Sequence, residues 1–175
     1  EFMDRAFDMS ETIQEILPKL HALVIGPGMG RKEQVFQSVM FVMKSAKSKD
    51  LPIVVDADGL WMLSQGNNLQ TIWDYENCIL TPNIMEFKIL VKAALRLVDK
   101  DKLGSQLVCA TCKFKGNPMK NELMNGLTSK YTDIQLSALA KSLGVTVLLK
   151  GAIDMVCCGS KRSSIMNNDH DEENN

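Results

Sequence analysis

The sequence predicts an α/β fold with a mostly parallel central sheet. Four short runs, ALVI, PIVV, NCIL and VTVLL, are continuously apolar rather than alternating, which is typical of strands that are buried on both faces. Stretches with helical spacing lie between them, and each run ends in a loop rich in Gly, Asp, Pro or Asn. We therefore expect helices on both faces of the sheet and ligands at the carboxyl ends of its strands.

The first half of the chain alternates helix and strand. Apolar residues at helical intervals predict an amphipathic helix over residues 9–19, and the run ALVI after it predicts a strand. A second helix is expected from Phe36 to Ala46, where apolar residues again recur every three or four positions. Pro52 then opens PIVV, the second strand.

The second half repeats this order. NCIL, residues 77–80, predicts a strand that Pro82 stops, and residues 83–97 follow with helical spacing. Another helix is expected over 132–143, because Gly144 is a suitable C-cap residue. VTVLL and DMVCC then predict two further strands.

Two regions have neither pattern. Residues 99–128 lack clear periodicity and are interpreted as an irregular insertion within a domain that spans residues 1–159. Residues 160–175 are rich in Asn, Asp and Glu and poor in apolar side chains, which predicts a disordered polar tail.

Composition excludes several classes of function. The net charge of −1 argues against a nucleic-acid partner and against an anionic membrane surface, and no apolar run approaches the ~20 residues that a transmembrane helix needs. Five cysteines are an odd number, which argues against a disulfide framework and favours a reduced compartment. We expect a cytoplasmic protein, with a mitochondrial location as the alternative.

The cysteines give little sign of a metal site. Cys109 and Cys112 form a CxxC without a second pair, which favours an ordinary loop over a zinc or redox site. Cys157 and Cys158 fall in an apolar run and are expected in the core. We predict no protein-borne metal site.

Four loops at expected strand ends carry unusual chemistry. In GPGMGR the alternating glycines let a flat or anionic group approach the main chain, although a tight strand-to-helix turn without a ligand fits equally well. In DADGL, Asp56 and Asp58 suit a hydroxyl-bearing ligand or a magnesium ion held through water, or else one of them caps the next helix.

The other two loops leave similar alternatives. In TPNIMEF, Asn83 and Glu86 have the spacing of a capping box as well as polar groups for a ligand. In KGAID, Lys150 at a strand end suits a nucleotide phosphate or ribose, or is simply a solvated lysine.

Taken together and in this order, the four segments resemble one family. HALVIGPGMGR, PIVVDADGLWML, ILTPNIMEFKIL and VTVLLKGAIDMV are similar to the ATP- or ADP-dependent NAD(P)H-hydrate dehydratases, also called carbohydrate kinase domain-containing proteins. The TPN form resembles the eukaryotic branch, which favours ATP. The resemblance implies a ribokinase-like three-layer sandwich, here incomplete at both ends.

The resemblance implies a repair reaction. Family enzymes phosphorylate the hydroxyl of the hydrated cofactors NADHX and NADPHX with ATP and release phosphate, which restores NADH or NADPH. Such chemistry needs positioning, magnesium to neutralise phosphoryl charge and a base for the hydroxyl proton. ATP and Mg²⁺ are therefore the expected cofactors, the hydrated dinucleotide is the expected partner, and a homo-oligomer is compatible with the family.

The family's site residues map onto the four loops. The resemblance places the hydrated dinucleotide against Gly28, Gly30, Asp58, Asn83, Ile84, Met85, Glu86, Phe87, Lys88 and Ile89. It places ATP against Lys150, Gly151, Ala152, Ile153 and Asp154.

The sequence departs from the family in one motif. The family's catalytic Asp lies in a GGxGD segment soon after the strand DMVCC, whereas this sequence continues as SKRSSIMNNDHDEENN. No catalytic residue is therefore assigned, and two alternatives stay open. One is a dinucleotide-binding fragment without catalysis, and the other is a small-molecule kinase of the same fold.

Overall fold

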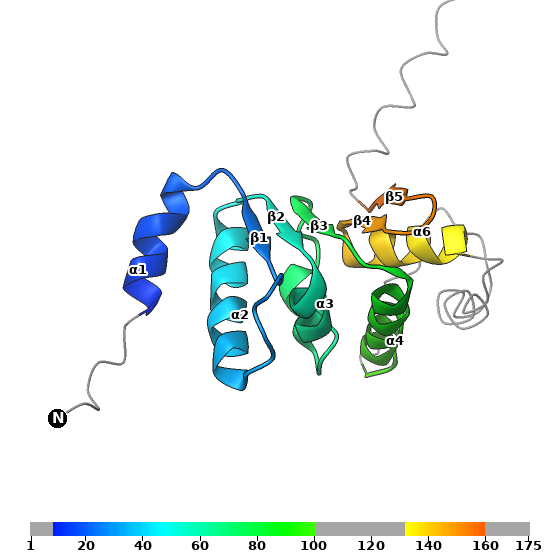
Figure 1. The fold of residues 1–175 in the computed structure, drawn as a ribbon, viewed down its shortest axis with the longest axis horizontal. Helices are drawn as coiled ribbons and strands as arrows, with labels where there is room; N and C mark the ends of the chain where they lie inside the picture. Colours follow the sequence, from blue (N-terminus) through cyan, green and yellow to red (C-terminus); the bar gives the residue numbers. More distant parts are fainter. Residues whose placement is uncertain (1–8, 101–131, 160–175) are drawn as a thin grey trace, which may run out of the picture.

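The described residues form a five-stranded sheet with the strand order β1-β2-β3-β4-β5 (Figure 1). The computed structural model describes residues 9–100 and 132–159, and the structural statements below concern these residues. β1 to β4 are parallel and β5 is antiparallel to β4. The strands are β1 (Leu23–Ile25), β2 (Ile53–Val55), β3 (Cys78–Leu80), β4 (Thr146–Leu149) and β5 (Met155–Cys158).

Helices follow or precede each parallel strand. The α-helices are α1 (Met9–Ile16), α2 (Glu33–Ser48), α3 (Ala57–Leu63), α4 (Ile84–Lys100) and α6 (Thr132–Leu143). Two 3₁₀ helices complete the set, η1 (Leu17–Lys19) and η2 (Asn68–Ile72). None of the described helices is long and apolar enough to cross a bilayer.

One face of the sheet carries the core. Alternate strand residues such as Val55, Leu80 and Val147 are fully buried and belong to one hydrophobic cluster with side chains from α2, α3, α4 and α6. Figure 1 shows these helices on the same side of the strands. The reason is topological: each right-handed crossover adds its strand on the same side of the previous one, which places every connecting helix on the same face.

The opposite face is open among the described residues. Val24 pairs with Val54, Val54 with Ile79, and Ile79 with Thr146, so these four side chains form a row across the sheet. Val24 is 69% exposed, and Val156 on β5 is 65% exposed. The fold class is the expected one, but the helices described here cover one face of the sheet rather than both.

Most predicted elements are confirmed with small shifts. The helix expected over 9–19 ends in a 3₁₀ turn that contains Pro18, since proline lacks the N–H needed inside a helix. α4 continues to Lys100, so it includes the first two residues of the expected insertion. The remainder of that insertion and the tail 160–175 lie outside the described residues, as do Cys109 and Cys112.

The described cysteines are free thiols. Cys78 is fully buried in β3, and burial raises the pKa of its thiol to about 12. Cys157 packs against the core as expected, but Cys158 is exposed, so its predicted core position is wrong. The cause is that β5 alternates, and Cys158 falls on the open face of the sheet.

The difference between the two faces can be tested on neighbouring strands. Leu80→Ala removes a fully buried side chain and should lower the free energy of unfolding by about 2–5 kcal/mol. Val24→Thr keeps a β-branched side chain at an exposed position and should change the free energy of unfolding by less than about 0.5 kcal/mol. Urea unfolding of both variants measures the two values, and a large loss for Val24→Thr would show that the open face is covered in solution.

Candidate active site

The four loops expected to carry the chemistry lie side by side at the carboxyl edge of the sheet. Backbone hydrogen bonds join each loop to the preceding strand or loop in space: Asp56 N–H to Ile25 O (3.0 Å), Thr81 N–H to Val55 O (3.1 Å) and Lys150 N–H to Pro82 O (2.8 Å). Asn83 and Lys150 also form a parallel bridge. The predicted convergence of these loops is confirmed.

The glycines of GPGMGR have two different roles. Gly26 has φ +124°, and a Cβ atom on it would lie 1.8 Å from the carbonyl oxygen of Asp56. What this glycine allows to approach is therefore the second loop, not a ligand. Gly28 and Gly30 also have positive φ, +67° and +74°, but a Cβ there would meet nothing within 4 Å. The open space expected for a ligand lies at these two residues.

Asp58 fixes the glycine loop. Its carboxylate accepts hydrogen bonds from Arg31 Nε (3.0 Å) and from the Gly30 N–H (3.1 Å), and the Arg31 guanidinium lies over the Trp61 ring, 4.7 Å from its centre. The bonds from Arg31 and Gly30 hold the pKa of Asp58 below its usual value. Asp58 therefore supports the loop that carries Gly28 and Gly30.

Asp56 points to the other side of the same turn. Its Oδ1 lies 2.7 Å from Lys150 Nζ, at the end of β4. Burial alone would raise the pKa of Asp56, but hydrogen bonds from Lys150, the Ala57 backbone and Thr81 together lower it. Asp56 stands at the N-cap position of α3 without a side-chain cap bond. The helix-cap interpretation of this loop is therefore wrong, because both carboxylates bind neighbouring loops instead.

The TPNIMEF segment begins α4 with a capping box. Asn83 Oδ1 accepts from the N–H groups of Met85 (2.9 Å) and Glu86 (3.0 Å), and Glu86 Oε2 accepts from the Asn83 N–H (2.8 Å). The capping alternative is thus confirmed for this pair. The first turn of α4 leaves Ile84 and Met85 exposed at the edge of the sheet.

The last three residues expected to contact the dinucleotide differ in their exposure. Phe87 is only 1% exposed and belongs to the core, so its side chain does not line the edge. Lys88 is half-buried, and Ile89 is exposed on the outer face of the helix. The helical repeat explains this, because neighbouring residues of one helix point to different sides.

KGAID forms a short turn between β4 and β5. The Gly151 N–H donates to Asp154 Oδ1 at 3.0 Å, which closes the turn. Ala152 is exposed at this turn, and Ile153 is 84% exposed. KGAID lies beside TPNIMEF through the Asn83–Lys150 bridge, and each of the two loops carries exposed apolar side chains.

Each carboxylate of the four loops already accepts a hydrogen bond. Asp56 and Asp58 bind cationic side chains, and Glu86 and Asp154 bind backbone N–H groups. No group of three metal-ligating side chains occurs in the part of the chain that the structure describes. These residues therefore do not fit a preformed Mg²⁺ site.

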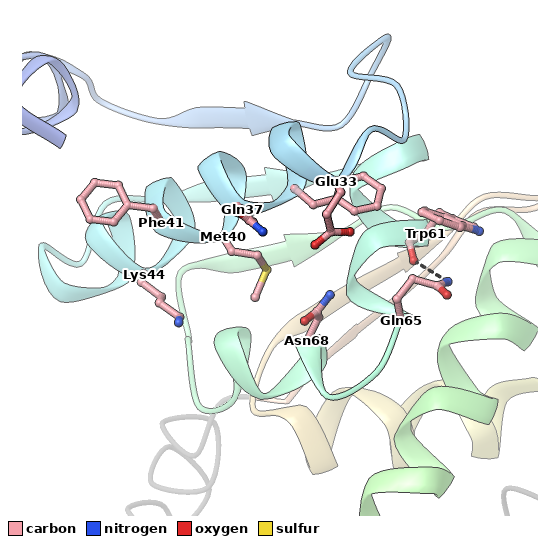
Figure 2. Close-up of a pocket in the computed structure, with 9 residues that line it drawn as sticks. Glu33, Gln37, Met40, Phe41, Lys44, Trp61, Gln65 and Asn68 are labelled. Atoms are coloured by element: carbon pink, nitrogen blue, oxygen red, sulfur yellow. Dashed lines mark hydrogen bonds between the residues drawn. The ribbon is translucent and has the colours of Figure 1, made fainter. Parts of the chain in front are cut away.

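A groove of about 630 Å³ lies elsewhere, between α2 and the α3–η2 segment (Figure 2). Figure 2 shows Trp61 and Gln65 on one side of it and Met40 and Phe41 on the other. None of its lining residues belongs to the four loops. Trp61, which lies under the Arg31 guanidinium, is the lining residue that contacts one of these loops. The groove is a separate feature of the helical layer.

Sequence reasoning missed Arg31 and the partner of Asp56. Arg31 directly follows the glycines, and its place in the motif GPGMGR was a usable signal. The pairing of Asp56 with Lys150 joins residues 94 positions apart and required the strand order.

The two kinds of glycine can be separated by alanine substitution. Gly26→Ala should lower the free energy of unfolding by at least about 3 kcal/mol, because the added methyl would overlap the Asp56 carbonyl and φ +124° is unfavourable for alanine. Gly28→Ala should lower the free energy of unfolding by only about 1–2 kcal/mol, because the left-handed conformation strains alanine but no atom clashes with the added methyl. Chemical denaturation measures both, and equal losses would contradict the distinction.

The Asp58 contacts predict a pH dependence. Because the pKa is lowered in the folded protein, the ionised carboxylate stabilises the fold above the unfolded pKa of about 3.9, and this contribution is lost as the pH falls through the folded pKa. Asp58→Asn should therefore be less stable than the wild type at neutral pH. The difference should shrink below about pH 4, as measured by thermal unfolding across pH. A difference that stays constant down to pH 2 would show that the carboxylate charge is not its source.

Comparison with known proteins gives one consistent family. The sequence model of the carbohydrate kinase family, described as NAD(P)H-hydrate dehydratase, matches residues 1–172. A relative from Mus musculus, named ATP-dependent (S)-NAD(P)H-hydrate dehydratase, is 35% identical over 158 residues, 88% of this chain and 37% of its own length.

Two further relatives carry the same name. The Aspergillus fumigatus protein is 47% identical over 152 residues, which are 86% of this chain and 37% of its own length. The Homo sapiens protein is 44% identical over 97 residues, which are 54% of this chain and 27% of its own length. The matched segments thus cover between 27% and 37% of the length of these relatives. The loop geometry, the parallel sheet and the match along nearly the whole sequence agree, and the chain belongs to the NAD(P)H-hydrate dehydratase family of carbohydrate kinase domains.

Proposed function

We propose that this chain acts in the ATP-dependent dehydration of NADHX and NADPHX to NADH and NADPH. Gly28 and Gly30 carry the proposal. They hold left-handed conformations over open space at the carboxyl edge of the sheet, where ligands of such sheets bind. Asp58 and Arg31 brace this loop, so its main chain is presented to a ligand in a fixed shape.

The dinucleotide side is proposed to extend along the start of α4. Ile84 and Met85, in the first turn of this helix, present exposed apolar surface for a flat ring. The side chains of Asn83 and Glu86 serve first to begin the helix and thereby set the direction of this surface. Phe87 anchors the helix in the core rather than contacting substrate.

ATP is proposed to bind on the KGAID side. Lys150 offers a cationic group for phosphate, and the turn closed by Asp154 exposes Ala152 and Ile153 for contact with the nucleotide. Mg²⁺ is proposed to arrive with the ATP phosphates, because the carboxylates of the four loops are engaged in the contacts described above.

A non-catalytic dinucleotide binder is the second candidate. It is favoured by the absence of a free carboxylate among the four loops, since phosphoryl transfer to a hydroxyl needs a base. A kinase that releases a stable phosphorylated product is a third outcome. A cytoplasmic or mitochondrial location and a homo-oligomer remain predictions from the sequence.

Alanine at Gly28 tests the dinucleotide side. The added methyl would fill the open approach, so Gly28→Ala should weaken NADPH binding by roughly tenfold in calorimetry. Gly66→Ala is the matched control, because Gly66 also has positive φ, +53°, and open space but lies outside the four loops. Equal affinity of the Gly28→Ala variant and the wild type for NADPH would contradict the proposed site.

The reaction is tested with NADHX and ATP. ATP-dependent return of the near-ultraviolet absorbance of reduced nicotinamide supports the dehydratase. Binding of both ligands without this return supports the non-catalytic binder, and stable phosphorylated NADHX supports the kinase. Absence of binding to both ligands would overturn the proposal.

A further inference from the structure

Lys150 is held at both its main chain and its side chain. Its N–H donates to the Pro82 carbonyl at 2.8 Å, and it forms a parallel bridge with Asn83. Its ammonium lies 2.7 Å from Asp56 Oδ1. Asp56 follows β2 and Lys150 follows β4, so the ion pair reaches across the end of β3. The ion pair therefore fixes the one part of Lys150 that the sheet leaves free, the four-carbon side chain.

Stability alone does not account for this pair. The Lys150 side chain is 41% exposed and that of Asp56 is 28% exposed. Exposed ion pairs contribute little to folding, because water screens them and ordering two side chains costs entropy. The main physical effect is on Lys150 itself, since a free lysine side chain has many rotamers.

From this arrangement we infer that Asp56 is a positioning residue that presents the Lys150 ammonium to the phosphates of ATP. The ammonium has three N–H donors, and Asp56 uses one of them, which leaves two for phosphate oxygens. With the side chain already ordered, ATP binding does not have to immobilise it. The inference rests on the proposed binding of ATP at residues 150–154. It adds a positioning role for Asp56, which is not one of those residues.

A competing effect gives the inference its test. The Asp56 carboxylate is negative and lies beside the place assigned to the phosphates, so its charge alone would weaken ATP binding. If charge dominates, removing the carboxylate strengthens binding. If positioning dominates, removing it weakens binding.

Calorimetric titration of the chain with ATP separates these two effects. Asp56→Ala should bind ATP about two- to tenfold more weakly than the wild type, whereas Asp56→Asn, which keeps an acceptor for Lys150, should recover most of the loss. In a Lys150→Met background, Asp56→Ala should cause no further loss. Glu15→Gln, on the exposed side of α1, controls for the change of net charge. Tighter binding by both Asp56 variants would overturn the inference.

A second readout does not depend on ATP. Labelling of lysines with an amine-reactive ester, quantified by mass spectrometry, should show faster modification of Lys150 in Asp56→Ala than in the wild type, with Lys44 and Lys141 unchanged. Unchanged labelling of Lys150 would show that Asp56 does not hold it, and so would overturn the inference even if ATP binds. Faster labelling in a chain that does not bind ATP would instead overturn the ATP side of the proposed function.

Discussion

The carboxyl edge of the sheet depends on the close approach of two main chains, at Gly26 and at Asp56. A side chain at Gly26 would overlap the Asp56 carbonyl, and a side chain at Gly59 would lie 2.8 Å from the carbonyl of Ile25. These two glycines allow the loops after β1 and β2 to pack against each other directly. The start of α3 is thereby fixed beneath the glycine loop, and the other contacts of the edge follow from this arrangement.

The turn at residues 56–58 divides the edge into two sides. Ala57 has φ +46°, an unusual conformation for a residue with a Cβ, and the two aspartates around it bind in different directions. Asp58 holds Gly30 and Arg31 on the side proposed for the dinucleotide, while Asp56 holds Lys150 on the side proposed for ATP. A single short turn thus positions both halves of the site, which gives the paired aspartates of DADGL a physical role.

The sequence was sufficient for the strands, for most of the α-helices and for the convergence of the loops, but not for η2. Continuous apolar strands and helical spacing are local signals, and parallel strands bring their carboxyl ends together in any order. Pairings between distant loops could not be predicted, because the Asp56–Lys150 contact depends on which strands are neighbours. The core position of Phe87 and the covering of a single face by the described helices also depend on packing in three dimensions. The capping box at Asn83 was predictable as an alternative, since its spacing is a local property.

ATP and the dinucleotide are proposed to bind on opposite sides of the 56–58 turn. Nuclear magnetic resonance titration of backbone amides, with ATP and NADPH added separately, tests this most directly. NADPH should shift the signals of Gly28 and Gly30, ATP should shift those of residues 150–154, and both ligands should shift those of the turn. Shifts confined to the groove between α2 and the α3–η2 segment, or shifts of both Gly28–Gly30 and residues 150–154 by each ligand, would contradict this arrangement.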